Sequence, residues 1–107
     1  MVKVTFYQNR DQQITGFDCL GHAEYAEGND IVCAAVSALV INCINSVETF
    51  TKDSFQCDTN ESDGMISFRF EGRVGDDSLL LLKSLLLGLQ EMENNYENYV
   101  DVIIEEV

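Results

Sequence analysis

The sequence has few basic residues and carries a large excess of acidic ones. Only 6 Lys and Arg residues stand against 19 Asp and Glu residues, which gives a formal net charge of −13. Phosphate repulsion opposes nucleic-acid binding at such a charge, so we expect no direct nucleic-acid partner. The same negative field attracts a basic protein or peptide, although an acidic surface also serves solubility alone.

The marks of secreted and membrane proteins are missing as well. The opening residues, MVKVTF, alternate in hydrophobicity and lack the charged lead, apolar block and cleavage site of a secretory signal. The longest uncharged run, residues 31–47, contains Ser and Asn residues and is short for a membrane span. We therefore predict a buried helix at this run, no membrane association and a cytoplasmic protein.

The four cysteines include no Cys-x-x-Cys pair; they are Cys19, Cys33, Cys43 and Cys57. A cytoplasmic chain keeps its thiols reduced, so the sequence predicts no disulfide framework. Cys43 lies within an apolar run, and Cys19 and Cys57 lie in strand patterns. These positions favour structural roles for all three.

Internal repeats, low-complexity tracts and linkers are also absent, and residues 1–107 are expected to form a single domain. Alternating or apolar segments predict five strands, at residues 2–7, 14–20, 55–58, 66–70 and 99–104. Two helices are predicted, the first capped by Asn29 or Asp30 and the second by Asp76-Asp77-Ser78. The order ββαββαβ indicates an α/β fold, a two-layer α/β sandwich with two helices packed on a mixed, mostly antiparallel sheet.

Both predicted helices are apolar over more than one face. The first is Ala-rich and apolar almost all round from Ile31 to Asn42. The second has a core stripe of Leu79, Leu82, Leu86 and Leu89, widened by Leu80, Leu81, Leu85 and Leu87. Helices of this kind are buried on more than one side. A second buried surface, such as the interface of a homodimer, is therefore expected.

His22, the only histidine, precedes Cys33 by eleven residues. A cysteine protease needs a thiolate, a base and donors for the oxyanion that forms on the attacked carbonyl. If Asp30 caps the helix, Cys33 lies in its first turn, where the helix end stabilises a thiolate and free amides can bind an oxyanion. Asp30 could instead orient His22, although capping is the commoner role at that place, and Ser37 shares the helix face of Cys33.

The residues alone leave other interpretations open. A cysteine in an apolar helix is commonly an inert core residue, and a lone loop histidine is commonly solvated. Cys19 and His22, with Cys33 or Cys57, also contain the ligand types of a zinc site. Residues three apart on an extended strand point to opposite faces, so Cys19 and His22 converge only if the strand has already turned.

The tripeptide GHA at residues 21–23, followed by DIVCAA at 30–35 and Ser37-Ala38, resembles the ribosomal-processing cysteine protease (Prp, YsxB-like) family. Length and element order match this family over essentially the whole chain. The resemblance implies a catalytic pair without a cofactor, with His22 as base and Cys33 as nucleophile. It also directs attention to three supporting or substrate-binding candidates: Asp30, Ala34 and Ser37.

The resemblance further implies what such a protease cuts. The substrate would be the basic precursor of a large-subunit ribosomal protein, whose short N-terminal extension is removed after a hydrophobic, aromatic-containing stretch. Family members are similar to one another in forming α/β homodimers. The segment 23–29 looks about one residue shorter than the family's usual loop.

The noncatalytic alternative is an acidic module that binds a basic ribosomal protein or assembly factor.

Overall fold

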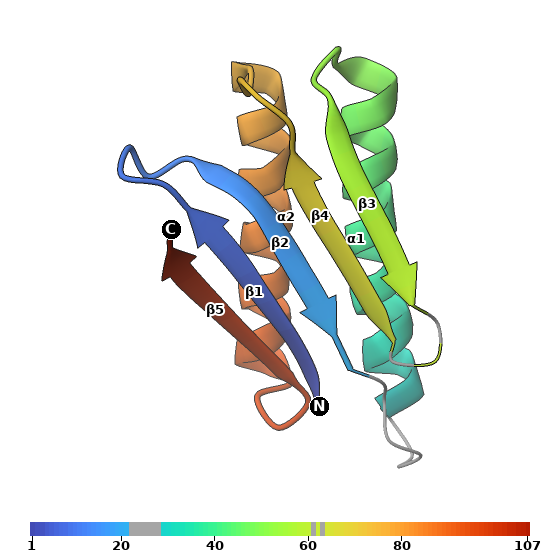
Figure 1. Ribbon diagram of the computed structural model, residues 1–107. Coiled ribbons are helices and arrows are strands. Elements are labelled where there is room, and N and C mark those ends of the chain that lie inside the picture. Colours follow the sequence, from blue (N-terminus) through green and yellow to red (C-terminus); the bar gives the residue numbers. More distant parts are fainter. Residues whose placement is uncertain (22–28, 61, 63) are drawn as a thin grey trace.

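The computed structural model describes residues 1–21, 29–60, 62 and 64–107, except for the side chains of residues 29 and 30. The element order is the predicted ββαββαβ. The elements are β1 Val2–Gln8, β2 Ile14–Leu20, α1 Asn29–Phe50, β3 Phe55–Asn60, β4 Met65–Phe70, α2 Asp76–Asn95 and β5 Val100–Glu106. Both helices lie on one face of the sheet (Figure 1), which confirms the two-layer α/β sandwich.

The sheet has the strand order β3-β4-β2-β1-β5. Strand β1 pairs antiparallel with β2 and parallel with β5, and the β2–β4 and β3–β4 pairs are antiparallel. The parallel β1–β5 pair requires a crossover connection, and the chain between these strands runs across the helix layer. The sheet is therefore mixed and mostly antiparallel, as predicted.

The β1–β2 hairpin contains a register shift that aims two apolar side chains at the helices. Tyr7 pairs with Gly16, but the next residue along β1, Gln8, pairs with Ile14, so Thr15 is an extra residue in β2. Because side chains alternate along a strand, the extra residue lets both Ile14 and Phe17 face the core. Ile14 is 4% exposed and Phe17 is fully buried.

Aromatic rings form the part of the core under β1, β2, β3 and β4. The ring centroid of Phe68 lies 5.2 Å from that of Phe17 and 4.8 Å from that of Phe55, and both pairs are stacked. It lies 4.9 Å from the centroid of Phe70 in an edge-on contact. Phe6 adds a tilted contact with Phe17 at 5.7 Å. Such pairs add stabilisation beyond simple area burial. This cluster fixes β2 and β4 side by side, and these strands support the site described below.

Helix α1 presents one buried stripe to the sheet. Its buried residues recur every three or four positions, as expected for one helix face: Val32, Val36, Val40, Cys43 and Val47. By length and composition alone, Ile31–Phe50 is long and apolar enough to cross a membrane. Core helices of globular proteins meet the same criterion. The stripe belongs to the core cluster shared with β1, β2 and β4, so within this chain α1 is buried along one face and not on more than one side as predicted.

The predicted cap of α2 is wrong. Gly75 is the N-cap and makes no side-chain cap bond, and the helix begins at Asp76. Ser78 is instead fully buried, and its hydroxyl donates to Asp53 Oδ2 at 2.5 Å. The Gly75 N–H donates to the same carboxylate oxygen at 2.9 Å. The Asp53 side chain, in the α1–β3 connection, thus caps the beginning of α2, a role that was predicted for Asp76-Asp77-Ser78.

The core stripe of α2 also differs from the prediction. Its buried leucines are Leu82, Leu85 and Leu89, whereas Leu79 and Leu86 are only half-buried. Leu80 and Leu87 are exposed by 66% and 61%. The stripe is rotated because α2 lies against α1 as well as against β2 and β5. Leu85, assigned to the widening of the stripe, is therefore part of the core.

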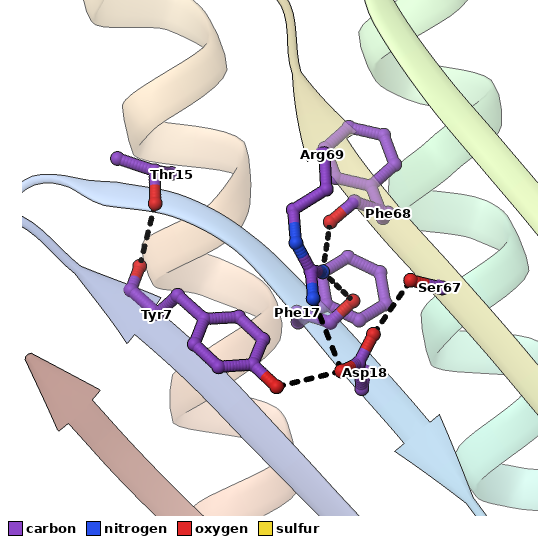
Figure 2. Close-up of polar contacts among 7 residues, drawn as sticks. All are labelled: Tyr7, Thr15, Phe17, Asp18, Ser67, Phe68 and Arg69. Atoms are coloured by element: carbon purple, nitrogen blue, oxygen red, sulfur yellow. Dashed lines mark hydrogen bonds and ion pairs between the residues drawn. The ribbon is translucent and has the colours of Figure 1, made fainter. Parts of the chain in front are cut away.

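The other face of the sheet carries a polar cluster built on Asp18 (Figure 2). The Asp18 carboxylate accepts hydrogen bonds from Tyr7 Oη and Ser67 Oγ, each at 2.6 Å, and from Arg69 Nη2 at 3.1 Å. The Arg69 guanidinium also lies 4.2 Å from the centre of the Tyr7 ring. This cluster joins β1, β2 and β4, and a Cβ on Gly16 would obstruct the Arg69 side chain at 2.8 Å.

The environment of Asp18 acts on its pKa in two directions. Burial raises the pKa, but the hydrogen bonds from Arg69, Ser67 and Tyr7 together outweigh burial and hold the pKa below its usual value. In turn, the hydrogen bond to Asp18 raises the pKa of Tyr7. Asp18 is thus held as a carboxylate.

Candidate functional site

A cavity of about 360 Å³, partly open to solvent, lies beside Cys33 and is called the Cys33 cavity below. The ends of β2 and β3 and the beginnings of α1 and β4 lie at the same end of the sandwich (Figure 1), and residues of these elements line the cavity. Its lining residues are Val2, Cys19, Gly21, Cys33, Val36, Ser37, Ile41, Thr59, Asn60, Gly64, Met65 and Ile66. Most of these side chains are apolar, so the cavity suits an apolar group.

One face of α1 forms a wall of the cavity. Cys33, Ser37 and Ile41 follow one another at four-residue intervals and therefore line up along the helix. Cys33 and Ser37 are half-buried, and Ile41 is 48% exposed. Ser37 and Cys33 both line this cavity, and a supporting or substrate-binding role of Ser37 stays a prediction. A group bound in the cavity can approach the Cys33 thiol directly.

The beginning of α1 differs from the prediction. The helix begins at Asn29, so Asp30 lies inside the first turn and is not the cap. Cys33 is consequently the fifth helical residue, and its own N–H belongs to the helical hydrogen-bond ladder. The free amides of the helix end belong to the residues before it, Asn29 to Ile31. Because α1 begins two residues earlier than it would with Asp30 as its cap, Cys33 lies about one half-turn farther from the helix end than predicted.

Gly21 connects β2 to the segment that contains His22. Its φ angle is +116°, a conformation that side-chain-bearing residues rarely adopt. A Cβ at this position would also lie 2.4 Å from the Met1 carbonyl oxygen. Both observations require glycine here. The chain therefore leaves β2 in a direction that only glycine permits, immediately before the predicted catalytic base.

The β3–β4 hairpin supplies the opposite wall of the cavity. Thr59 pairs with Ile66 and Asn60 with Met65 at the end of the hairpin. The Asn60 Oδ1 atom accepts hydrogen bonds from Ser62, from N–H at 3.1 Å and from Oγ at 2.7 Å. These bonds orient the Asn60 amide at the cavity rim. The wall therefore combines apolar side chains with an ordered amide and the Thr59 side chain.

The remaining candidate residues, Ala34, Asp30 and His22, differ in how much of them the structure describes and in their relation to the cavity. Ala34 is exposed and does not line the cavity, and only the backbone of Asp30 is described. His22 lies outside the described residues, so its distance from Cys33 stays a prediction. The zinc hypothesis depends on His22 and is untested for the same reason; among the described residues no three potential ligands gather.

The sequence interpretation missed most of the cavity. Ile41 had a usable signal, because it continues the four-residue spacing of Cys33 and Ser37. Cys19 was taken as structural, yet it is both buried and part of the cavity wall. Thr59, Asn60 and Met65 had no local signal, since their proximity to Cys33 depends on the strand order. Cys57, also taken as structural, lies exposed on the edge strand β3.

Comparison with known sequences identifies relatives that match almost the whole chain. The chain is 29% identical over 107 residues to the protein named ribosomal processing cysteine protease Prp of Bacillus subtilis (strain 168), covering 95% of this chain and 96% of that protein. It is 28% identical over 101 residues to the protein of the same name from Staphylococcus aureus (strain Mu50), covering 94% and 95%.

Solved structures show the same fold. The crystal structure of an essential ribosomal processing protease Prp from S. aureus with a covalently linked product peptide matches with a TM-score of 0.90 and 26% identity, covering 98% of this chain and 100% of that one. The crystal structure of SMU.848 from Streptococcus mutans gives a TM-score of 0.90 and 27% identity, covering 100% and 99%. The sequence profile of the cysteine protease Prp family matches residues 1–101. This chain therefore belongs to the cysteine protease Prp family.

Proposed function

We propose that this protein is a site-specific cysteine endopeptidase that removes the N-terminal extension of a large-subunit ribosomal protein. Cys33 is the nucleophile and His22 the base in this proposal. The observation that carries it is the position of Cys33 in the wall of an apolar cavity at one end of the sandwich. Two similar proteins are named ribosomal processing cysteine proteases, and an S. aureus Prp structure contains a substrate peptide.

The chemistry of the proposal follows from the chemical groups near the helix end. His22 takes the proton of the Cys33 thiol, and the sulfur attacks the carbonyl carbon of the scissile bond. The free amides of the first turn of α1 are the nearest helical donors for the resulting oxyanion. His22 then protonates the departing amine, which leaves a thioester on Cys33. Finally, His22 takes a proton from a water molecule that hydrolyses this thioester and frees the thiol.

The cavity favours an apolar side chain next to the scissile bond. Val36, Ile41 and Ile66 contribute its apolar surface. Removing an apolar side chain of the substrate from water is favourable by roughly 1.5–3 kcal/mol when burial is complete. This agrees with the cleavage site after a hydrophobic, aromatic-containing stretch that the family resemblance implies. Ser37 on α1 and Asn60 on the β3–β4 hairpin provide polar groups on opposite walls of the cavity for the peptide backbone.

The net charge of the protein supports a basic substrate. With a net charge of −13, the protein attracts a positively charged ribosomal-protein precursor and repels the phosphates of ribosomal RNA. The attraction acts mainly on the association rate and weakens with salt. We infer a cytoplasmic location as well, since all four cysteines are free thiols and ribosomal proteins are made there.

The test uses mass spectrometry of a ribosomal-protein precursor that carries its N-terminal extension. Wild type is expected to make one cut, while Cys33→Ala and His22→Ala make none. Cys57→Ala serves as the matched control, because Cys57 is exposed and does not line the cavity. Cleavage by Cys33→Ala at the wild-type rate would exclude the assigned nucleophile. Binding of an intact precursor by folded wild type would favour the noncatalytic acidic module.

We also propose that the protein is a homodimer that uses the outer surface of its helix layer. Leu80 and Leu87 lie two helical turns apart on one face of α2, and both are exposed. Ile31 of α1 is 71% exposed. Leu80→Lys with Leu87→Lys is expected to convert a dimer to a monomer in light scattering, whereas Ile104→Lys on β5 leaves the mass unchanged. A monomeric wild type would refute this proposal.

A further inference from the structure

Cys19 and Cys33 approach the same space from two different elements. Cys19 is on the inner face of β2, paired across the sheet with Val4 and Ile66, and it is 6% exposed. Cys33 is on α1, half-buried, and both residues line the Cys33 cavity. The proposed mechanism assigns no role to Cys19. A second thiol thus lies in the wall that contains the proposed nucleophile.

The electrostatics of Cys19 agree with this proximity. Burial raises the pKa of the Cys19 thiol to about 11, and negative charge on Cys33 adds to this increase. Coulombic influence between two thiols requires them to be close, because it decays with distance. Cys19 is therefore a neutral thiol that borders on the reactive one.

The other two cysteines are poor partners for this pair. Cys43 follows Cys33 by ten residues on the same helix, which corresponds to a separation of about 15 Å. Its thiol also contacts the Leu81 carbonyl oxygen at 3.6 Å, on the side facing α2. Cys57 lies two strands away from Cys19, roughly 10 Å or more. Disulfide geometry requires Cα atoms within about 7 Å, so Cys43 does not suit Cys33 and Cys57 does not suit Cys19.

We propose that Cys19 and Cys33 form a redox modification site, in which peroxide converts the two thiols into a disulfide that reversibly blocks the cavity. The proposal rests on Cys33 being the reactive thiol, as assigned above. Cys33 is the more exposed of the two and reacts first, and Cys19 then resolves the oxidised sulfur. The disulfide protects Cys33 from irreversible oxidation.

The chemistry balances in two steps. The Cys33 thiolate attacks one oxygen of hydrogen peroxide, the O–O bond breaks, hydroxide leaves and Cys33 becomes a sulfenic acid. The Cys19 sulfur then attacks the Cys33 sulfur, the S–O bond breaks, and water leaves with the proton from Cys19. Two thiols are oxidised, one peroxide is reduced to two water molecules, and one S–S bond forms. A dithiol reductant returns both sulfurs to thiols by thiol–disulfide exchange and is itself oxidised to a disulfide.

The experiment uses the full chain in its Cys43→Ala form, reduced, treated with hydrogen peroxide and alkylated with iodoacetamide. Cleavage after glutamate separates residues 1–24, with Cys19, from residues 28–48, which then contain Cys33 alone. A non-reducing digest is expected to contain these two peptides joined by a disulfide. An alkylated Cys19 beside an oxidised Cys33, a link from Cys33 to Cys57 or to a second chain, or two unreacted thiols would overturn the proposal.

The Cys19→Ala variant provides the second arm. Without a resolving thiol, Cys33 is expected to proceed to the sulfinic acid, which dithiothreitol does not reverse. In the wild type, dithiothreitol is expected to restore both free thiols and precursor cleavage after a loss of at least about tenfold. Equal recovery of reduced Cys33 in wild type and Cys19→Ala would contradict the protective role. Disulfide formation without precursor cleavage by the reduced protein would refute the proposed function and leave this site intact.

Discussion

Replacing Gly21 with alanine tests how the end of β2 directs the chain toward the site. The substitution forces an L side chain into φ +116° and brings its Cβ within 2.4 Å of the Met1 carbonyl oxygen. The positive φ alone costs about 1–2 kcal/mol, offset by about 0.4–1 kcal/mol from the stiffer unfolded chain. Displacing Met1 and the neighbouring Val2 adds about 1–3 kcal/mol, a cost typical of overpacking. We expect a total destabilisation of about 1–4.6 kcal/mol.

Gly72→Ala is the matched control for this prediction. Gly72 also has a positive φ, +81°, but a Cβ there would meet nothing within 4 Å. Its cost is therefore the backbone strain alone, about 1 kcal/mol after the unfolded-chain effect. Because Gly72 lies between β4 and α2, it does not contribute to the Cys33 cavity. The comparison separates the steric contact with Met1 from the strain common to both glycines.

Urea unfolding and precursor cleavage measure the two consequences. Gly21→Ala is expected to lower the unfolding free energy more than Gly72→Ala and to reduce kcat/KM by about 10- to 100-fold, because the proposed base His22 follows directly and small displacements of a catalytic group are costly. Gly72→Ala is expected to cleave as wild type does. Equal unfolding midpoints and equal cleavage by both variants would refute the assigned role of Gly21.

Three other substitutions test the cavity, the outer sheet face and the core. Ile41→Ser is expected to lower kcat/KM about tenfold for a precursor with an apolar side chain at the cut, while the similarly exposed Ile104→Ser leaves it unchanged; equal losses contradict a cavity-specific effect. Asp18→Asn is expected to cost about 1 kcal/mol in urea unfolding at pH 7. Since the folded-state pKa of Asp18 is lowered, the difference in unfolding free energy between wild type and variant is fully present above the unfolded pKa of about 3.9. It disappears as the pH falls through the folded-state pKa, and a pH-independent difference would contradict the stabilising role of the Asp18 carboxylate. Phe68→Ala is expected to cost about 3–5 kcal/mol, against almost nothing for the exposed Phe50→Ala, and similar unfolding midpoints contradict the aromatic core.

Local patterns were sufficient for the elements and for part of the site. Alternation predicted the β1–β2 hairpin, and helical spacing placed Cys33 and Ser37 on one face, where both line the cavity. These predictions succeed because strand and helix periodicity are properties of neighbouring residues. The resemblance in residues 21–38 then indicated the family, which the comparisons confirmed over residues 1–101.

Helix ends were predicted less well because other segments compete for their capping groups. The sequence assigned the start of α2 to Asp76-Asp77-Ser78, but Asp53 accepts hydrogen bonds from both Gly75 and Ser78. The Asp53 side chain reaches α2 only after the chain has folded. Its pKa is lowered by these bonds, first by the one from Ser78 and then by the one from the Gly75 amide. No local pattern around Asp76 contains this information.

The sequence by itself determined the order of elements, the acidic charge and the residues available for chemistry, because each depends on composition or on neighbouring positions. Only the tertiary structure decided what surrounds Cys33. The strand order β3-β4-β2-β1-β5 brings Cys19 and the β3–β4 turn to the beginning of α1, although Met65 is far from Cys33 along the chain. Strand order depends on the packing of the whole sheet against both helices, and the cavity exists only where those distant segments meet.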